Sequence, residues 1–128
     1  MNQDQDIHQF IKEIREKFPN VSTRIDAWMI HQGFEPEDEM YTAMMEAFSQ
    51  ATTDAIKIRD EVTAREHLEY MSKKLHSASK IEAEYIDVYY VESLMWDIKD
   101  KNIKKWGWSV IPDNLKALYT EVWGEQNF

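Results

Sequence analysis

The sequence predicts an all-α protein with a single domain of about six helices. The chain has 128 residues, which is an ordinary length for one domain. It contains only three Gly and three Pro, whereas β-sandwiches and β-barrels use many such residues in turns. Its apolar residues recur every three or four positions, which is the spacing of a helix face. Whether the helices form an antiparallel bundle or stacked helix pairs stays open.

The segments with this apolar spacing are residues 7–18, 20–33, 36–58, 64–78, 79–95 and 112–124. The first should end at Pro19, because the residue before a proline avoids the α region. The second is short, and Gly33 suits its C-terminal cap.

The third helix is predicted to begin at Pro36 and to reach Ile58. Proline suits the first position of a helix. The carboxylates of 37–39 would then lie in the first turn, where the positive end of the helix dipole stabilises them. We therefore expect these acidic side chains on a rigid helical surface.

The fourth and fifth helices are separated by Ser77 or Ser79, either of which can cap the fifth. Residues 79–95 are apolar on most sides, so this helix is expected at the centre of the fold. A charged connection follows over 97–105. Pro112 opens the last helix and Gly124 ends it.

The formal net charge is −9, and residues 1–61 hold 13 acidic but only six basic side chains. This balance argues against nucleic acid or an anionic membrane as a partner, because both are bound through Lys and Arg. A lysine cluster at 99–105 beside Trp106 and Trp108 could bind single-stranded nucleic acid by charge and stacking. Asp97 and Asp100 interrupt that cluster, so it is interpreted as a solvated helix end.

The chain contains no Cys, which excludes disulfides and thiolate metal sites. Its first six residues are polar and acidic, unlike a signal peptide. No apolar run approaches the roughly 20 residues that a bilayer requires. We expect a protein of the reducing cytoplasm.

No motif indicates a reaction. The four His are scattered, no Glu-x-x-His sequence occurs, and neither a Gly-x-Ser-x-Gly elbow nor a Gly-rich phosphate loop is present. A carboxylate metal enzyme is a minor alternative. We therefore expect no enzyme activity, no catalytic residues, no metal and no cofactor.

The most informative segment runs from Ile25 to Ile56, with seven acidic side chains and no Lys or Arg. A surface of one sign attracts cationic partners and raises their association rate. Its soft methionines are also typical of adaptable binding surfaces. The residues predicted to contact a partner are Glu35, Glu37, Asp38, Glu39, Glu46 and Asp54, with Trp28, Phe34 and Met40 as apolar anchors.

The C-terminal part carries a recognisable pattern, Tyr90-Val91-x-x-Leu94, then Trp106, then Pro112-x-x-Leu115-Lys116-x-Leu118-Tyr119-x-x-x-Trp123. It resembles the ending of a family of small all-helical bacterial proteins whose domain has no known function. Small acidic helical proteins of this kind resemble the immunity proteins of bacterial toxin systems, which occlude a cognate toxin. That resemblance supplies no catalytic residues.

Two functions follow as hypotheses. The first is an immunity-like inhibitor that covers a basic toxin domain with its acidic surface. The second is a helical scaffold or adaptor that forms homo-oligomers through its aromatic C-terminal helices. The oligomeric state itself is not predicted.

Overall fold

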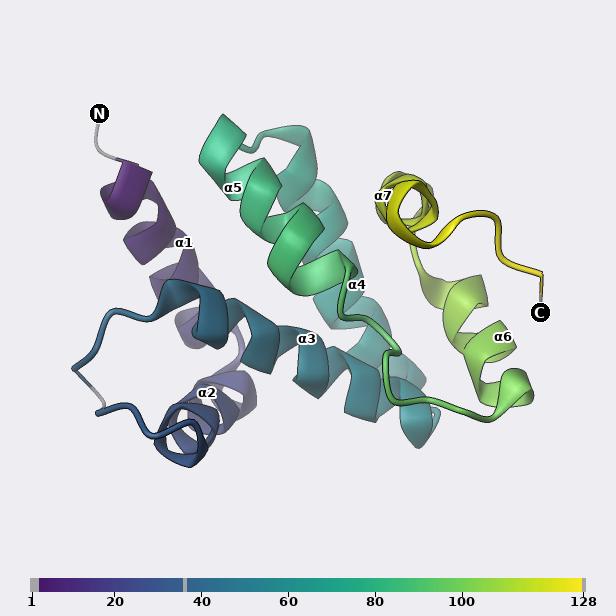
Figure 1. The fold of residues 1–128 in the computed structure, drawn as a ribbon, viewed down its shortest axis with the longest axis horizontal. Helices are drawn as coiled ribbons and strands as arrows, with labels where there is room; N and C mark the ends of the chain where they lie inside the picture. Colours follow the sequence, from purple (N-terminus) through teal and green to yellow (C-terminus); the bar gives the residue numbers. More distant parts are fainter. Residues whose placement is uncertain (1–2, 36, 128) are drawn as a thin grey trace.

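The computed structural model describes residues 3–35 and 37–127, and these ranges contain helices and no strands. The predicted all-α class is confirmed (Figure 1). The elements are α1 (Gln3–Lys17), α2 (Pro19–His31), α3 (Tyr41–Lys57), α4 (Glu61–His76), α5 (Lys80–Tyr85), the π-helix η1 (Ile86–Val91), α6 (Lys101–Val110) and α7 (Asp113–Trp123).

Several predicted boundaries are confirmed. Pro19 begins α2 directly after α1 ends. The fourth helix begins earlier than the predicted residue 64, because Asp60 caps α4 by accepting a hydrogen bond from the Thr63 amide. Ser79 caps α5 in a reciprocal arrangement with Glu82, in which each side chain accepts from the other's backbone amide.

The central helix is α3, which contacts α1, α2, α4, α6 and η1. In Figure 1 it crosses the middle of the molecule, with α1 and α2 on one side and α6 and α7 on the other. The expectation that residues 79–95 form the centre is therefore wrong. Small side chains on α3 explain the difference, because they let neighbouring helices approach closely on several sides. They include Ala43, Ala47, Ser49, Ala51, Thr52, Thr53 and Ala55, all buried.

The predicted fifth helix changes its winding partway along. It begins as α5 and continues as η1, where the Glu92 amide donates to the carbonyl of Asp87, five residues earlier. The wider turn brings Ile86 and Val91 into the core and leaves Val88 exposed. The chain then turns through Met95, whose φ of +61° is in the left-handed region.

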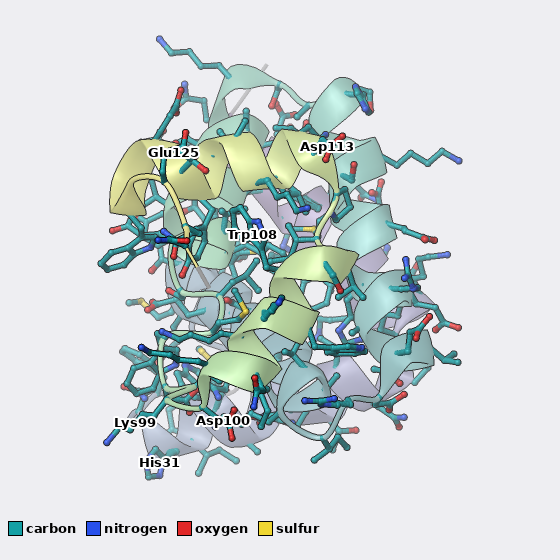
Figure 2. All side chains as sticks on the ribbon, turned by 90° about the vertical axis from the view of Figure 1, so that its right-hand side faces the viewer. His31, Lys99, Asp100, Trp108, Asp113 and Glu125 are labelled. Carbon is teal, nitrogen blue, oxygen red and sulfur yellow. The ribbon has the colours of Figure 1, made fainter. Side chains whose placement is uncertain are left out.

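Residues 101–110 form a helix, so part of the predicted charged connection is helical. In Figure 2, Trp108 lies between α6 and α7. Its ring packs edge-on against Tyr119 at 5.4 Å, and the Lys116 ammonium lies 5.3 Å from its centroid. At the C-terminal end of α7, Trp123 is 56% exposed although the segment 112–124 has the apolar spacing of a helix face.

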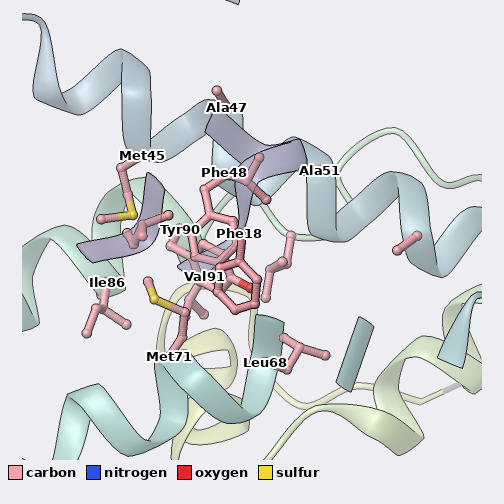
Figure 3. Packing of buried hydrophobic residues seen from close by; sticks show 14 of the residues in the cluster. Phe18, Met45, Ala47, Phe48, Ala51, Leu68, Met71, Ile86, Tyr90 and Val91 are labelled. Atoms are coloured by element: carbon pink, nitrogen blue, oxygen red, sulfur yellow. The ribbon is translucent and has the colours of Figure 1, made fainter. Parts of the chain in front are cut away.

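The buried apolar side chains form one cluster that draws on every helix except α5, whose partly buried Ile81 and Tyr85 pack against it. Figure 3 shows its centre, where Phe18, Phe48 and Tyr90 pack together. The buried polar side chains of the described residues are Ser49, Thr52, Thr53 and His67, and Thr52 and His67 are hydrogen-bonded to each other. Apolar side chains of the segments predicted as helices are not all buried, and the exposed ones include Ile58, Val88, Val122 and Trp123.

Candidate functional site

The acidic loop between α2 and α3, described over residues 32–35 and 37–40, is positioned by a Schellman motif at the end of α2. Gly33 has a φ of +87° and its amide donates to the Ile30 carbonyl. The Phe34 amide donates to the Met29 carbonyl, five residues earlier. The Phe34 ring is half-buried and packs against the core. It therefore fixes the point from which the acidic loop leaves the helix.

The carboxylates of Glu35, Glu37, Asp38 and Glu39 are all exposed on the acidic loop. The Asp38 carboxylate accepts from the Glu35 amide at 2.9 Å, and the Asp38 amide donates to the Glu35 carbonyl at 3.0 Å. The prediction that 37–39 form a first helical turn is wrong, because α3 begins only at Tyr41. Asp38 bonds the local backbone instead. The predicted helix start at Pro36 lies outside the described residues.

Basic side chains of α1 stand near the acidic loop without pairing with it. Lys12 and Arg15 line a 310 Å³ hollow together with the side chains of 37–39. Arg15 is already bound to Asp26 at 2.6 Å. Among the described residues, no Lys or Arg lies within ion-pair distance of the four loop carboxylates. Their negative charge is therefore available to another molecule.

Asp54 has a different environment from the loop carboxylates. It accepts from Arg24 at 2.5 Å and from Gln50 at 2.9 Å, and Lys57 lies 3.5 Å away. Partial burial acts to raise the Asp54 pKa, but these hydrogen bonds and the charges of Arg24 and Lys57 lower it overall. Lys57 also pairs with Asp97. The structure thus places Asp54 in an internal ion-pair network, separate from the acidic loop.

Glu46 and Trp28 line a second feature, which we call the tryptophan cleft. Its walls are Trp28, Glu46, Gln50, Ser93 and Trp96, and its volume is 190 Å³. Burial raises the pKa of the half-buried Glu46. The Trp96 indole N–H donates to the Gln50 side-chain oxygen at 2.7 Å.

The sequence did not predict Trp96 as a site residue, although its ring is 65% exposed. It also missed Ile30, which is 65% exposed near the end of α2, while the predicted anchor Met40 is 38% exposed. Ile30 belongs to a segment with the apolar spacing of a helix face, and Trp96 directly follows another such segment. No local pattern distinguishes them from buried neighbours.

The remaining hollows and titratable groups are less suited to a site. A hollow of 720 Å³ between α1 and α4 mixes acidic and basic walls, including the ion pair between Lys74 and Glu13. No three His, Asp or Glu side chains in 3–35 and 37–127 come together as a metal site would require. No helix in the same ranges combines the length and apolar character needed to cross a bilayer.

Residues 11–125 match a family described as "Domain of unknown function (DUF7674)". The chain belongs to this family. The match includes the acidic loop, the tryptophan cleft and all of α7, so both surface features lie inside the DUF7674 domain. No curated protein and no solved structure matches the chain.

Proposed function

We propose that this DUF7674 protein is a binding protein that docks a cationic protein on the acidic loop. The main support is that Glu35, Glu37, Asp38 and Glu39 are exposed together and that no ion-pair partner for them lies in the described part of the chain. Asp26 and Asp54, by contrast, are paired internally. Unpaired carboxylates close to one another raise the local negative potential and accelerate encounter with a positive surface.

The sharper form of this proposal is an immunity-like inhibitor that acts in the cytoplasm without catalysing a reaction. A toxin nuclease holds nucleic acid with Lys and Arg, and carboxylates on the acidic loop would occupy the same cationic groups as phosphate does. Met40 and Ile30, both exposed, supply apolar contact beside the charges. Apolar contacts of this kind slow dissociation, whereas the charges mainly accelerate association.

The experiment compares the wild-type chain with a charge-reversed loop, E35K/E37K/E39K. A control variant, E66K/E69K/E125K, makes the same change in net charge at other exposed positions. Each tagged protein is used to capture proteins from the cells that produce it. We expect a basic protein captured by the wild type and the control but not by the loop variant.

The rate at which each variant associates with the captured protein is then measured. At low salt, the loop variant should associate at least about tenfold more slowly, and its rate should depend less on salt. For the inhibitor form, the captured protein should arrest growth when expressed alone, and co-expression of the wild-type chain should restore growth. Equal association rates for the loop variant and the control would exclude the acidic loop as the docking surface.

A homo-oligomeric scaffold remains the second candidate because α7 exposes Val122 and Trp123. However, the charges of Glu92 and Glu121 raise the pKa of Asp87 on the adjoining η1, after the larger effect of its own burial. A two-fold dimer would bring these carboxylates near their copies, which is unfavourable. Sedimentation equilibrium at micromolar concentration decides: a stable dimer that W123A abolishes would favour the scaffold.

A further inference from the structure

The tryptophan cleft has the dimensions of a pocket for one side chain. Its 190 Å³ is smaller than the roughly 300–1,000 Å³ of sites that hold drug-sized ligands. It lies between α2, α3 and the turn after η1, with Trp28 and Trp96 among its walls. Aromatic rings and a carboxylate in so small a space favour a flat or cationic group.

Trp96 is held in place although its ring is 65% exposed. Its indole N–H donates to the Gln50 oxygen, and the Gln50 amide in turn donates to Asp54 at 2.9 Å and to Asp97 at 3.4 Å. The backbone of the same turn is fixed by the Met95 amide, which donates to the buried Thr53 hydroxyl at 3.1 Å. The indole therefore needs little additional ordering when another group packs on it.

Glu46, Gln50 and Asp54 follow each other at intervals of four, so they share one face of α3. At one end of this row, Asp54 is neutralised by Arg24 and Lys57. At the other end, no Lys, Arg or His of the described chain pairs with Glu46. Burial raises the Glu46 pKa, and no cation offsets the unfavourable burial of the charged form. Within the described chain, the Glu46 end of this row, beside Trp28 and Trp96, therefore has a carboxylate but no paired cation.

We propose that the tryptophan cleft binds an arginine side chain of the partner, with the guanidinium hydrogen-bonded to Glu46 and stacked on Trp96. Arginine fits better than lysine because its planar group stacks on an indole and bonds a carboxylate through two N–H groups. The inference rests on the proposed function, since a protein partner delivers the arginine. It places that arginine outside the acidic loop, so the two can fail separately.

The test uses a short blocked peptide, Gly-Arg-Gly, and its citrulline and lysine counterparts. Binding is followed by the five tryptophan indole N–H signals in ¹H–¹⁵N spectra, which W28F and W96F assign. The arginine peptide should move the Trp28 and Trp96 signals in a saturable manner. The Trp123 signal should stay in place, because that indole bonds the Glu92 carbonyl and does not line the cleft.

The substitution E46Q keeps the shape of the side chain and should weaken arginine-peptide binding at least about tenfold. W96A, at an exposed position, should weaken it as well. The matched control E69Q changes an exposed carboxylate outside both the acidic loop and the cleft by the same chemistry and should leave peptide affinity unchanged.

Three results would overturn the assignment: no saturable shift, an E46Q affinity equal to wild type, or a citrulline or lysine peptide bound as tightly as arginine. None of them bears on the loop variant's association with a captured partner. Conversely, if E35K/E37K/E39K associates normally while E46Q loses the arginine peptide, the loop proposal fails and the cleft stands.

Discussion

The hydroxyl of Thr52 lies 3.0 Å from Nδ1 of His67, within the buried core. The same hydroxyl is 2.8 Å from the hydroxyl of Tyr90 and 3.2 Å from the Phe48 carbonyl. The His67 ring also packs edge-on against Phe18 and Phe48. A polar group is thus hydrogen-bonded at the centre of an apolar cluster, where burial disfavours the charged form of the imidazole.

This environment predicts that the protein loses stability in mild acid. Burial lowers the pKa of His67 to about 4; nearby Asp60 acts to raise it and Arg24 to lower it further. The unfolded chain, with a histidine pKa near 6.5, binds the proton first, so stability falls as pH drops from about 6.5 toward 4. Between pH 7 and 5 the free energy of unfolding should fall by about 2 kcal/mol from this group.

Denaturant titrations at pH 7, 6 and 5 measure this effect. H67Q removes the titrating group, so its stability should change less over this range than that of the wild type. H31Q, at an exposed histidine, is the control and should keep the wild-type dependence. A steep wild-type slope retained in H67Q would assign the acid sensitivity to other groups.

Gly107 is predicted to be required for the docking of α6. A Cβ at this position would lie 2.7 Å from Cγ2 of Ile56 and 2.8 Å from Sδ of Met95, both fully buried. G107A should therefore destabilise by about 1–3 kcal/mol, although alanine has the higher helix propensity. Thermal unfolding compares it with K105A at an exposed position of α6. A Tm at or above wild type would contradict the packing argument.

Thr53 is predicted to hold the turn after η1. Its hydroxyl accepts from the amide of Met95, the residue with φ of +61°. T53V keeps the side-chain shape but leaves that buried amide unpaired, which should cost about 1–3 kcal/mol. T53S retains the hydroxyl, so its Met95 amide should stay protected from hydrogen exchange while that of T53V exchanges faster. Equal exchange in the two variants would show that the bond contributes little.

The acidic side chains are predicted to divide into structural and binding groups. D54N weakens the contacts with Arg24 and Lys57, so it should lower the Tm. E35Q/E37Q/E39Q removes charges that repel one another, so it should leave the Tm unchanged or raise it. The rate of association with the partner should fall more in E35Q/E37Q/E39Q than in D54N. A Tm lowered equally by both would mean that the acidic loop is also held by electrostatics within the fold.

Much of the fold could be predicted from the sequence because its helix ends carry local signals. Helix ends are stabilised locally by Ser79, Asp60 and Gly33, through hydrogen bonds with the adjacent backbone. The central position of α3 could not be predicted, because alanine, serine and threonine do not stand out in an apolar stripe. The π-helix could not be predicted either, because its i→i+5 hydrogen bond shifts which side chains face inward.

The candidate site was predicted less completely than the fold. The loop carboxylates are close in sequence, so they stay together whichever structure the loop adopts. The surroundings of Asp54 and Trp96 depend on residues that are distant in the sequence. Arg24 neutralises Asp54, and Gln50 holds Trp96 at the surface by a hydrogen bond. Contacts between segments that far apart leave no trace in the local spacing of residues.

The burial pattern of α3 bears on how relatives of this chain could diverge. Most of the helix is surrounded by neighbours, and one narrow row reaches solvent, at Thr42, Glu46, Gln50 and Asp54. Substitutions elsewhere on α3 would disturb two or more helices at once. Changes at Thr42 or Glu46 would alter partner preference while the architecture is preserved, whereas Gln50 and Asp54 also make contacts within the fold. Lineages within DUF7674 should therefore differ at Thr42 and Glu46 if they recognise different proteins.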